Sequence, residues 1–173
     1  MLQRLIMSSV MGLAIAAAPG AALAKRAPPP TLFTSADLEL IVPPLDPGCI
    51  LGPAAKSATP DQAVDYCTAA IAAVEARKLN IKTLNERAGL SFVIASLDFA
   101  RAGAYVKIDG VRSARTCTSA ERVFAQMLAI DAKLFDAEMA GSLIQSRGAV
   151  SRSVAACRKD FGTATGAPAL LPG

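Results

Sequence analysis

The chain has 173 residues, of which 53% are hydrophobic and 5% aromatic, with 18 Lys plus Arg, 14 Asp plus Glu and no histidine. Without histidine, Ser-His-Asp and Cys-His catalysis, histidine-bound metals and most neutral-pH proton shuttles are excluded. The nearly balanced charge, the scarcity of aromatic residues and the absence of tryptophan argue against nucleic acid as a partner.

The first 24 residues have the layout of a secretory signal peptide. Arg4 precedes an apolar stretch, which a Pro-Gly pair and a small-residue end at 19–24 then close. The pair interrupts the run before it reaches the about 20 apolar residues that a membrane span needs. We therefore expect residues 1–24 to be removed after Ala24, a mature chain without a transmembrane helix, and a periplasmic or secreted location.

Residues 25–59 are predicted to form a proline-rich extended arm. Prolines recur from Pro28 to Pro60, and repeated proline prevents long helices and central strands. The arm has room for one short helical turn, at about 36–41.

The remainder of the chain is predicted to be helical, because it is rich in alanine and has no proline from 61 to 161. Thr59 suits the N-cap of the first helix, with Pro60 at the first helical position. We expect helices at 59–78, at about 82–94 with a continuation or restart near Ser96, at 118–130 with Thr118 or Ser119 as cap, at 135–147, and, after Gly148, at 149–161. With the turn in the arm, these give about six helices in an all-α protein. The helical domain spans 60–161 and a flexible tail spans 162–173.

Four cysteines remain in the mature chain, an even number that favours disulfides in an oxidising compartment. Their spacings of 18, 50 and 40 residues lack the paired motifs of zinc sites and of c-type haem attachment. We therefore expect no metal and no cofactor. Four cysteines allow three pairings, among which we favour Cys49 with Cys67 and Cys117 with Cys157.

Three helical segments share one rhythm: AVDYCTAAI (63–71), AERVFAQML (120–128) and SVAACRKDF (153–161). Each has a small residue, a cysteine or phenylalanine four places later, and a packing position three places after that. Gly141 and Gly148 stand seven apart before the last segment. The pattern resembles the tetratricopeptide repeat, a helix-turn-helix unit with a small residue midway along its first helix and a glycine at the turn.

A further stretch, NERAGLSF followed by ASLDFARAGAY, looks like another unit that is one residue short between its helices. The resemblance covers about 60–161 and is degenerate. Ala132 stands where the family often has proline, Asp160 replaces a small apolar residue, and the family's tryptophan is absent. Two architectures of antiparallel helix pairs stay open: a short tetratricopeptide-like solenoid of the bacterial cell envelope, or an unrelated helical bundle.

In the tetratricopeptide family, exposed positions of each unit's first helix line a concave groove. The resemblance implies that a groove here contains Thr83, Glu86, Glu138, Ser142 and Gln145. On a helix that packs inward through Ala137, Gly141 and Ile144, the last three of these residues also share an adjoining face. With polar tips and little bulk, that face suits hydrogen bonding to an extended chain.

A basic stretch follows, since every charged residue between Glu138 and Asp160 is a cation. Arg152 and Lys159, seven apart, share a helical face that we expect to attract phosphate or carboxylate groups of a partner or an anionic envelope polymer. The alternative is an ordinary solvated face.

An enzyme built from this chain would have to use carboxylates. The candidates are Glu75, Glu86, Asp136 and Glu138, each of which also fits a solvated helix surface or a helix start. We therefore assign no catalytic residue. The expected function is a non-catalytic exported interaction or scaffolding module that binds a peptide or protein segment of the envelope. The alternative is a small envelope enzyme or ligand carrier on a disulfide-tied bundle.

Overall fold

A computed structural model describes residues 31–45, 48–49, 59–163 and 167–171, so the predicted signal peptide lies outside the described residues. Five α-helices and one short 3-10 helix are found among these residues: α1 (Ser35–Ile41), α2 (Pro60–Leu79), α3 (Leu84–Asp109), α4 (Ala114–Leu128), η2 (Ala132–Leu134) and α5 (Ala137–Phe161). The described residues contain no β-strand, only an isolated parallel bridge between Phe33 and Phe135. The all-α prediction is confirmed.

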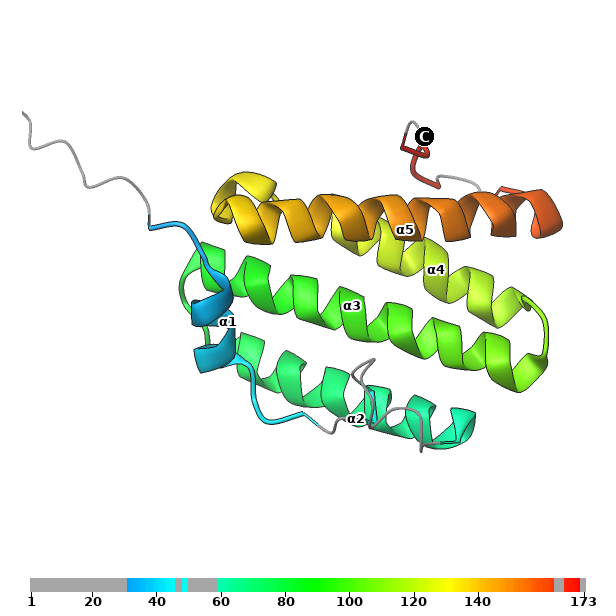
Figure 1. Cartoon of the computed structure of the whole chain (residues 1–173), viewed down its shortest axis with the longest axis horizontal. Helices are drawn as coiled ribbons and strands as arrows, with labels where there is room; N and C mark the ends of the chain where they lie inside the picture. The colour runs from blue at the N-terminus through cyan, green and yellow to red at the C-terminus, as the bar shows by residue number, and fades with distance from the viewer. Residues whose placement is uncertain (1–30, 46–47, 50–58, 164–166, 172–173) are drawn as a thin grey trace, which may run out of the picture. The chain divides into compact units, whose positions relative to one another are not determined.

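The four long helices pack in the order of the chain. Each contacts mainly its sequence neighbour, so α3 lies between α2 and α4, and α4 lies between α3 and α5 (Figure 1). The core between them is formed by large apolar side chains that are fully buried, among them Val74, Leu90, Phe124, Leu143 and Val154. Among the described helices, only α3 is long and apolar enough to cross a membrane. Half of its apolar window is buried inside the protein, which is typical of a core helix.

Two predicted helix starts can be compared with the observed caps. Thr59 caps α2 in a capping box with Gln62, and Pro60 is the first helical residue, as predicted. The predicted start of α4 at Thr118 or Ser119 is wrong. Ser113 is the N-cap, because its side chain accepts a hydrogen bond from the backbone N–H of Thr116.

The predicted helix break at Gly148 is also wrong, and of the two options near Ser96 the structure has the continuation. α3 runs unbroken through Ser96, and α5 runs unbroken through Gly148. In both places buried side chains lie on either side of the unfavourable position, Ile94 and Leu97 in α3 and Leu143 and Val150 in α5, so that packing against the core carries the helix through. A tetratricopeptide unit would need a turn at Gly148, and no such repeat is visible in the described residues. The shared rhythm of the three segments has a simpler cause, since Cys67, Phe124 and Cys157 all face the core.

The N-terminal arm is part of the same compact unit as the helices from Thr31 onward. Phe33 is fully buried, and its ring contacts the ring of Phe135 with centroids 6.0 Å apart. The backbone N–H of Phe33 donates to the carbonyl of Leu134 (2.9 Å), and its carbonyl accepts from the N–H of Asp136 (3.0 Å). The arm is therefore anchored by its own side chain and backbone, in addition to the disulfide predicted from the sequence.

Gly89 on α3 makes room for this anchor. A Cβ atom at Gly89 would overlap the aromatic ring of Phe33, so only glycine allows the ring to lie against the helix backbone. The requirement comes from a residue 56 positions earlier in the chain.

We expect Gly89→Ala to lower the free energy of unfolding by about 1–3 kcal/mol, because the methyl group overpacks the core. The matched control is Gly103→Ala, also within α3, where a Cβ meets nothing within 4 Å. The control is expected to stabilise the protein by up to about 1 kcal/mol through helix propensity. Urea unfolding measures both, and equal shifts in the two variants would contradict the role given to Phe33.

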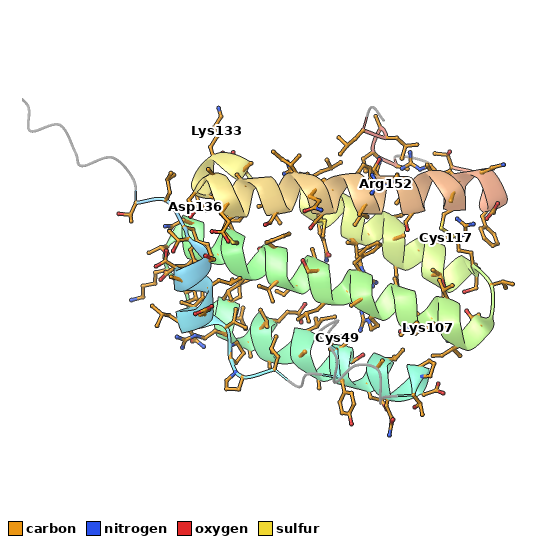
Figure 2. The ribbon with its side chains drawn as sticks, viewed as in Figure 1. Cys49, Lys107, Cys117, Lys133, Asp136 and Arg152 are labelled. Atoms are coloured by element: carbon orange, nitrogen blue, oxygen red, sulfur yellow. A yellow bond between two sulfur atoms is a disulfide. The ribbon has the colours of Figure 1, made fainter. Side chains whose placement is uncertain are left out.

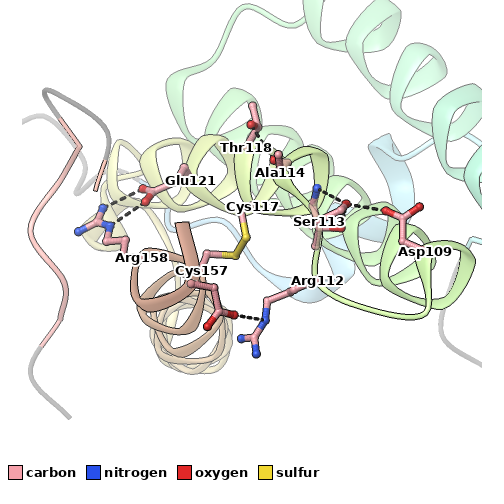
Figure 3. The surroundings of a disulfide bond; sticks show 11 residues. Asp109, Arg112, Ser113, Ala114, Cys117, Thr118, Glu121, Cys157 and Arg158 are labelled. Atoms are coloured by element: carbon pink, nitrogen blue, oxygen red, sulfur yellow. Dashed lines mark hydrogen bonds and ion pairs between the residues drawn. A yellow bond between two sulfur atoms is a disulfide. The ribbon is translucent and has the colours of Figure 1, made fainter. Parts of the chain in front are cut away.

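Both disulfides join the cysteines that the sequence analysis favours. Cys49 is bonded to Cys67 and ties the arm to α2, whereas Cys117 is bonded to Cys157 and ties α4 to α5. Beside the second bond, the guanidinium of Arg158 donates two hydrogen bonds to Glu121, at 2.7 and 2.8 Å (Figure 3). Three links, one covalent and two polar, thus hold the same part of α4 against α5.

We expect the oxidised protein to show no free thiol when denatured. In the chain-entropy description, replacing Cys117 and Cys157 by Ser lowers the free energy of unfolding by about 4 kcal/mol, and replacing Cys49 and Cys67 lowers it by about 3 kcal/mol. Thiol titration and denaturant unfolding test this. Two or more titratable thiols in the oxidised protein would rule out the pairing.

Candidate functional site

A groove of about 1130 Å³ lies between α2, α3 and the end of α4. Nine of its fifteen lining residues are apolar, and four of these are alanines, whose small side chains leave space between the helices. The alanines are Ala72 and Ala76 of α2, Ala88 of α3 and Ala129, which follows α4. Ile94 and Leu134 add larger apolar surface.

Two strongly exposed leucines lie at one end of the groove, at the turn between α2 and α3. Leu79 is 88% exposed and Leu84 is 70% exposed. The turn also carries Arg77, Lys78 and Lys82 and no acidic residue. Large apolar side chains left in water beside an apolar groove are typical of a surface that another molecule covers.

Six of the fifteen residues that line the groove are polar or charged. Ser91 and Gln126 line it, and the amide oxygen of Gln126 is buried without a hydrogen-bond partner in the described part of the chain. A buried carbonyl without a donor is unfavourable for the fold. Four charged residues complete the lining: Glu75, Lys78, Arg87 and Asp131.

Asp98 holds α3 and α4 together one helical turn beyond Ile94. Its buried carboxylate accepts hydrogen bonds from Arg122 of α4 (2.9 and 3.0 Å) and from Arg101 (2.8 Å). Arg101 also donates to the hydroxyl of Thr68 on α2, at 3.1 Å. This network joins the three helices that form the groove.

Arg147 of α5 supports the end of α4, which forms part of the groove. Its guanidinium donates to the carbonyls of Met127 (3.0 Å) and Ile130, which are left without helical partners where α4 ends. Burial lowers the pKa of Arg147 from its usual range. Two of the four cations between Glu138 and Asp160 therefore have structural roles. Arg147 supports the end of α4, and Arg158 pairs with Glu121.

The residues predicted for a groove on α3 and α5 do not come together. Thr83 is the N-cap of α3, and its hydroxyl donates to the carboxylate of Glu86, so the pair forms a local helix start. The arm lies between the start of α3 and the start of α5. The side-chain amide of Asn85 on α3 donates to the carbonyl of Thr31 (2.9 Å), and the backbone N–H of Asp136 donates to the carbonyl of Phe33. Figure 2 shows Asp136 at the start of α5 beside the arm.

The predicted residues of α5 are exposed, although the helix is rotated from its predicted orientation. Glu138, Ser142, Gln145, Arg152 and Lys159 all face solvent. However, Ala137, Gly141 and Ile144, expected to pack inward, are exposed as well, and Ile144 is 61% exposed. The inward face is instead formed by the larger residues Met139, Leu143, Val150 and Val154. The two sets predicted separately, polar and basic, thus lie on one exposed side of α5.

Of the carboxylates considered for catalysis, Glu75 lines the groove, whereas the other three lie at helix starts, Glu86 in the first turn of α3. Asp136 is the N-cap of α5, because its carboxylate accepts from the N–H of Met139 at 2.8 Å. Glu138 follows in the first turn, where an acidic side chain is favoured by the helix dipole. Among the described residues, no group of three or more potential ligands could hold a metal ion.

Sequence reasoning missed the groove entirely. Alanines that come from three separate segments give no periodic signal of a cavity, because alanine occupies both buried and exposed helix positions in this chain. One signal of the groove was available in the stretch RKLNIKTL (77–84). Two leucines there flank a turn, and the stretch carries three basic residues and no acidic one. The chain matches no protein-family model, and no curated protein or solved structure is similar to it.

We expect Arg147→Met to lower the free energy of unfolding by about 1–3 kcal/mol, because two carbonyls at the end of α4 lose their donor. Arg152→Met on the same helix is the control, since Arg152 is exposed and expected to change stability by no more than about 0.5 kcal/mol. Denaturant unfolding in dilute solution compares the two. Equal effects would show that Arg147 does not support the end of α4.

Proposed function

We propose that this protein is a non-catalytic interaction module that binds a peptide or protein segment in the groove between α2, α3 and α4. The observation that carries the proposal is a groove lined mainly by apolar residues, with the strongly exposed Leu79 and Leu84 at one end. Such a surface suits a segment with apolar side chains.

Two further features support this proposal. The connections of four residues, 80–83 and 110–113, suit antiparallel neighbours, which leave a continuous groove along a helix pair. The Asp98 network holds the groove helices in one register, so that little has to be ordered on binding. We also propose export to an oxidising compartment such as the periplasm, with which two disulfides are compatible.

The alternative of a small enzyme or ligand carrier has less support. An enzyme or carrier site is expected to enclose its ligand and to direct several polar groups at it. Nine of the fifteen lining residues here are apolar, and the leucines at one end of the groove are open to solvent. An interaction surface therefore accounts better for these residues.

The proposal can be tested with a displayed random-peptide library selected on the immobilised protein. Ala76→Leu combined with Ala129→Leu fills the groove, and we expect it to weaken the selected peptides at least tenfold, which is about 1.4 kcal/mol. The control combines Ala73→Leu with Ala125→Leu, which adds the same side chains to exposed positions of α2 and α4 that do not line the groove. The control is expected to bind like wild type.

A third variant compares the groove with the surface of α5. Replacing Glu138, Ser142 and Gln145 by Ala is expected to leave both folding and peptide binding almost unchanged. Loss of binding in this variant, with normal binding in the groove-filled one, would move the site to α5. Failure to select any peptide would contradict the proposal.

A further inference from the structure

The turn between α2 and α3 holds two leucines in water. Leu79, the last residue of α2, is 88% exposed, and Leu84, the first residue of α3, is 70% exposed. The turn between them has a fixed shape, because the backbone N–H of Ile81 donates to the carbonyl of Lys78 (3.2 Å) and the Ile81 side chain packs against the core. The two leucines are therefore held outside the core by ordered structure. We call residues 77–84 the α2–α3 tip.

The α2–α3 tip is basic as well as apolar. It carries Arg77, Lys78 and Lys82 and no acidic residue. None of these three cations makes an ion pair within the described part of the chain. The nearest acids along the chain, Glu75 and Glu86, lie outside the tip on either side. Positive charge thus surrounds the exposed leucines.

The connection at the other end of α3 also has four residues but differs in its charges. Val111 is 65% exposed there. Two of the cations around it are paired, however. Arg112 pairs with Asp160 at 3.3 Å, and Arg115 pairs with Asp109. Exposed leucines among cations without acids are therefore a property of the α2–α3 tip and not of both ends of the helix.

The shape and size of the α2–α3 tip favour a membrane over a protein as its partner. The tip is a turn at one end of the α2–α3 pair (Figure 1), and its leucines protrude from it. A protein partner needs a complementary surface of about 800 Å² on each side for a stable contact, far more than two leucines supply. A bilayer needs no complementary cavity, since apolar side chains enter the boundary between headgroups and acyl chains.

We propose that the α2–α3 tip inserts into the surface of a membrane that contains anionic phospholipid. Leu79 and Leu84 enter the apolar boundary below the headgroups, where their burial is favourable. Arg77, Lys78 and Lys82 lie at the level of the headgroups, whose negative charge attracts them. This goes beyond the proposed function, because it places the groove at a membrane surface.

Co-sedimentation with lipid vesicles tests the apolar part of the proposal, using the exported protein after removal of the predicted signal peptide. We expect wild type to bind vesicles of equal amounts of phosphatidylglycerol and phosphatidylcholine, but not vesicles of phosphatidylcholine alone. Leu79→Ser combined with Leu84→Ser is expected to weaken binding at least about tenfold. Val111→Ser, at the other end of α3, is the control and is expected to bind like wild type. Circular dichroism checks that each variant is folded.

Charge reversal tests the basic part. Arg77→Glu combined with Lys82→Glu is expected to weaken binding to the anionic vesicles at least about tenfold, because attraction to the headgroups becomes repulsion. The control combines Arg152→Glu with Lys159→Glu, which changes the net charge equally at exposed positions of α5. This control is expected to retain binding. Added salt is expected to weaken the binding of wild type, because it screens the same attraction.

Three outcomes would overturn the proposal: no binding of wild type to the anionic vesicles, equal binding to phosphatidylcholine alone, or binding that neither double variant weakens. Failure here is distinguishable from failure of the proposed function. Peptide selection contains no lipid, and neither Arg77 nor Lys82 lines the groove, so their reversal is expected to leave peptide binding unchanged. The groove-filled variant is expected to bind vesicles like wild type.

Discussion

The buried carboxylate of Asp98 determines how the helices of this protein can pack. A charge in a helix interface costs several kcal/mol unless it is paired, so α3 and α4 are held in the register that brings Arg122 to Asp98. The groove depends on that register, because Ile94 lies one turn from Asp98 and Gln126 lies one turn from Arg122. A shift by one turn would separate the carboxylate from Arg122 and leave it paired with Arg101 alone. Because the buried carboxylate is stable only when it is paired, its pairing with Arg122 favours a single shape of the groove.

Features that depend on nearby residues could be predicted from the sequence. The cap at Thr59, the short helix in the arm and the all-α class all follow from local preferences, and the favoured disulfide pairing is the one in the structure. Features that depend on distant residues could not. The anchoring of Phe33 requires Gly89 and Phe135, and no local pattern connects three residues so far apart.

The same distinction between local and distant features holds for the candidate site. Exposure of the polar residues of α5 could be predicted, because their spacing follows one helix. The orientation of α5 was mispredicted, because alanine and glycine were counted as apolar, whereas the larger Met139 and Leu143 gain more from burial and face the core. Whether the predicted residues of α3 and α5 meet could not be decided from the sequence, because it depends on where the arm lies. The groove itself is space between small side chains of α2, α3 and the end of α4. It depends on how these helices pack, which no single stretch of sequence specifies.

The anchored arm has a consequence for the order in which the chain folds. Synthesis proceeds from the N-terminus, so Phe33 is made long before its contacts at Gly89 and Phe135, which follow it by 56 and 102 residues. Until Phe135 has emerged from the ribosome, the aromatic ring has no complete pocket, and the arm stays exposed to proteases and to premature cysteine pairing. The first segment to be made is thus among the last to be secured, and a chain that stops before α5 leaves both its ends unprotected.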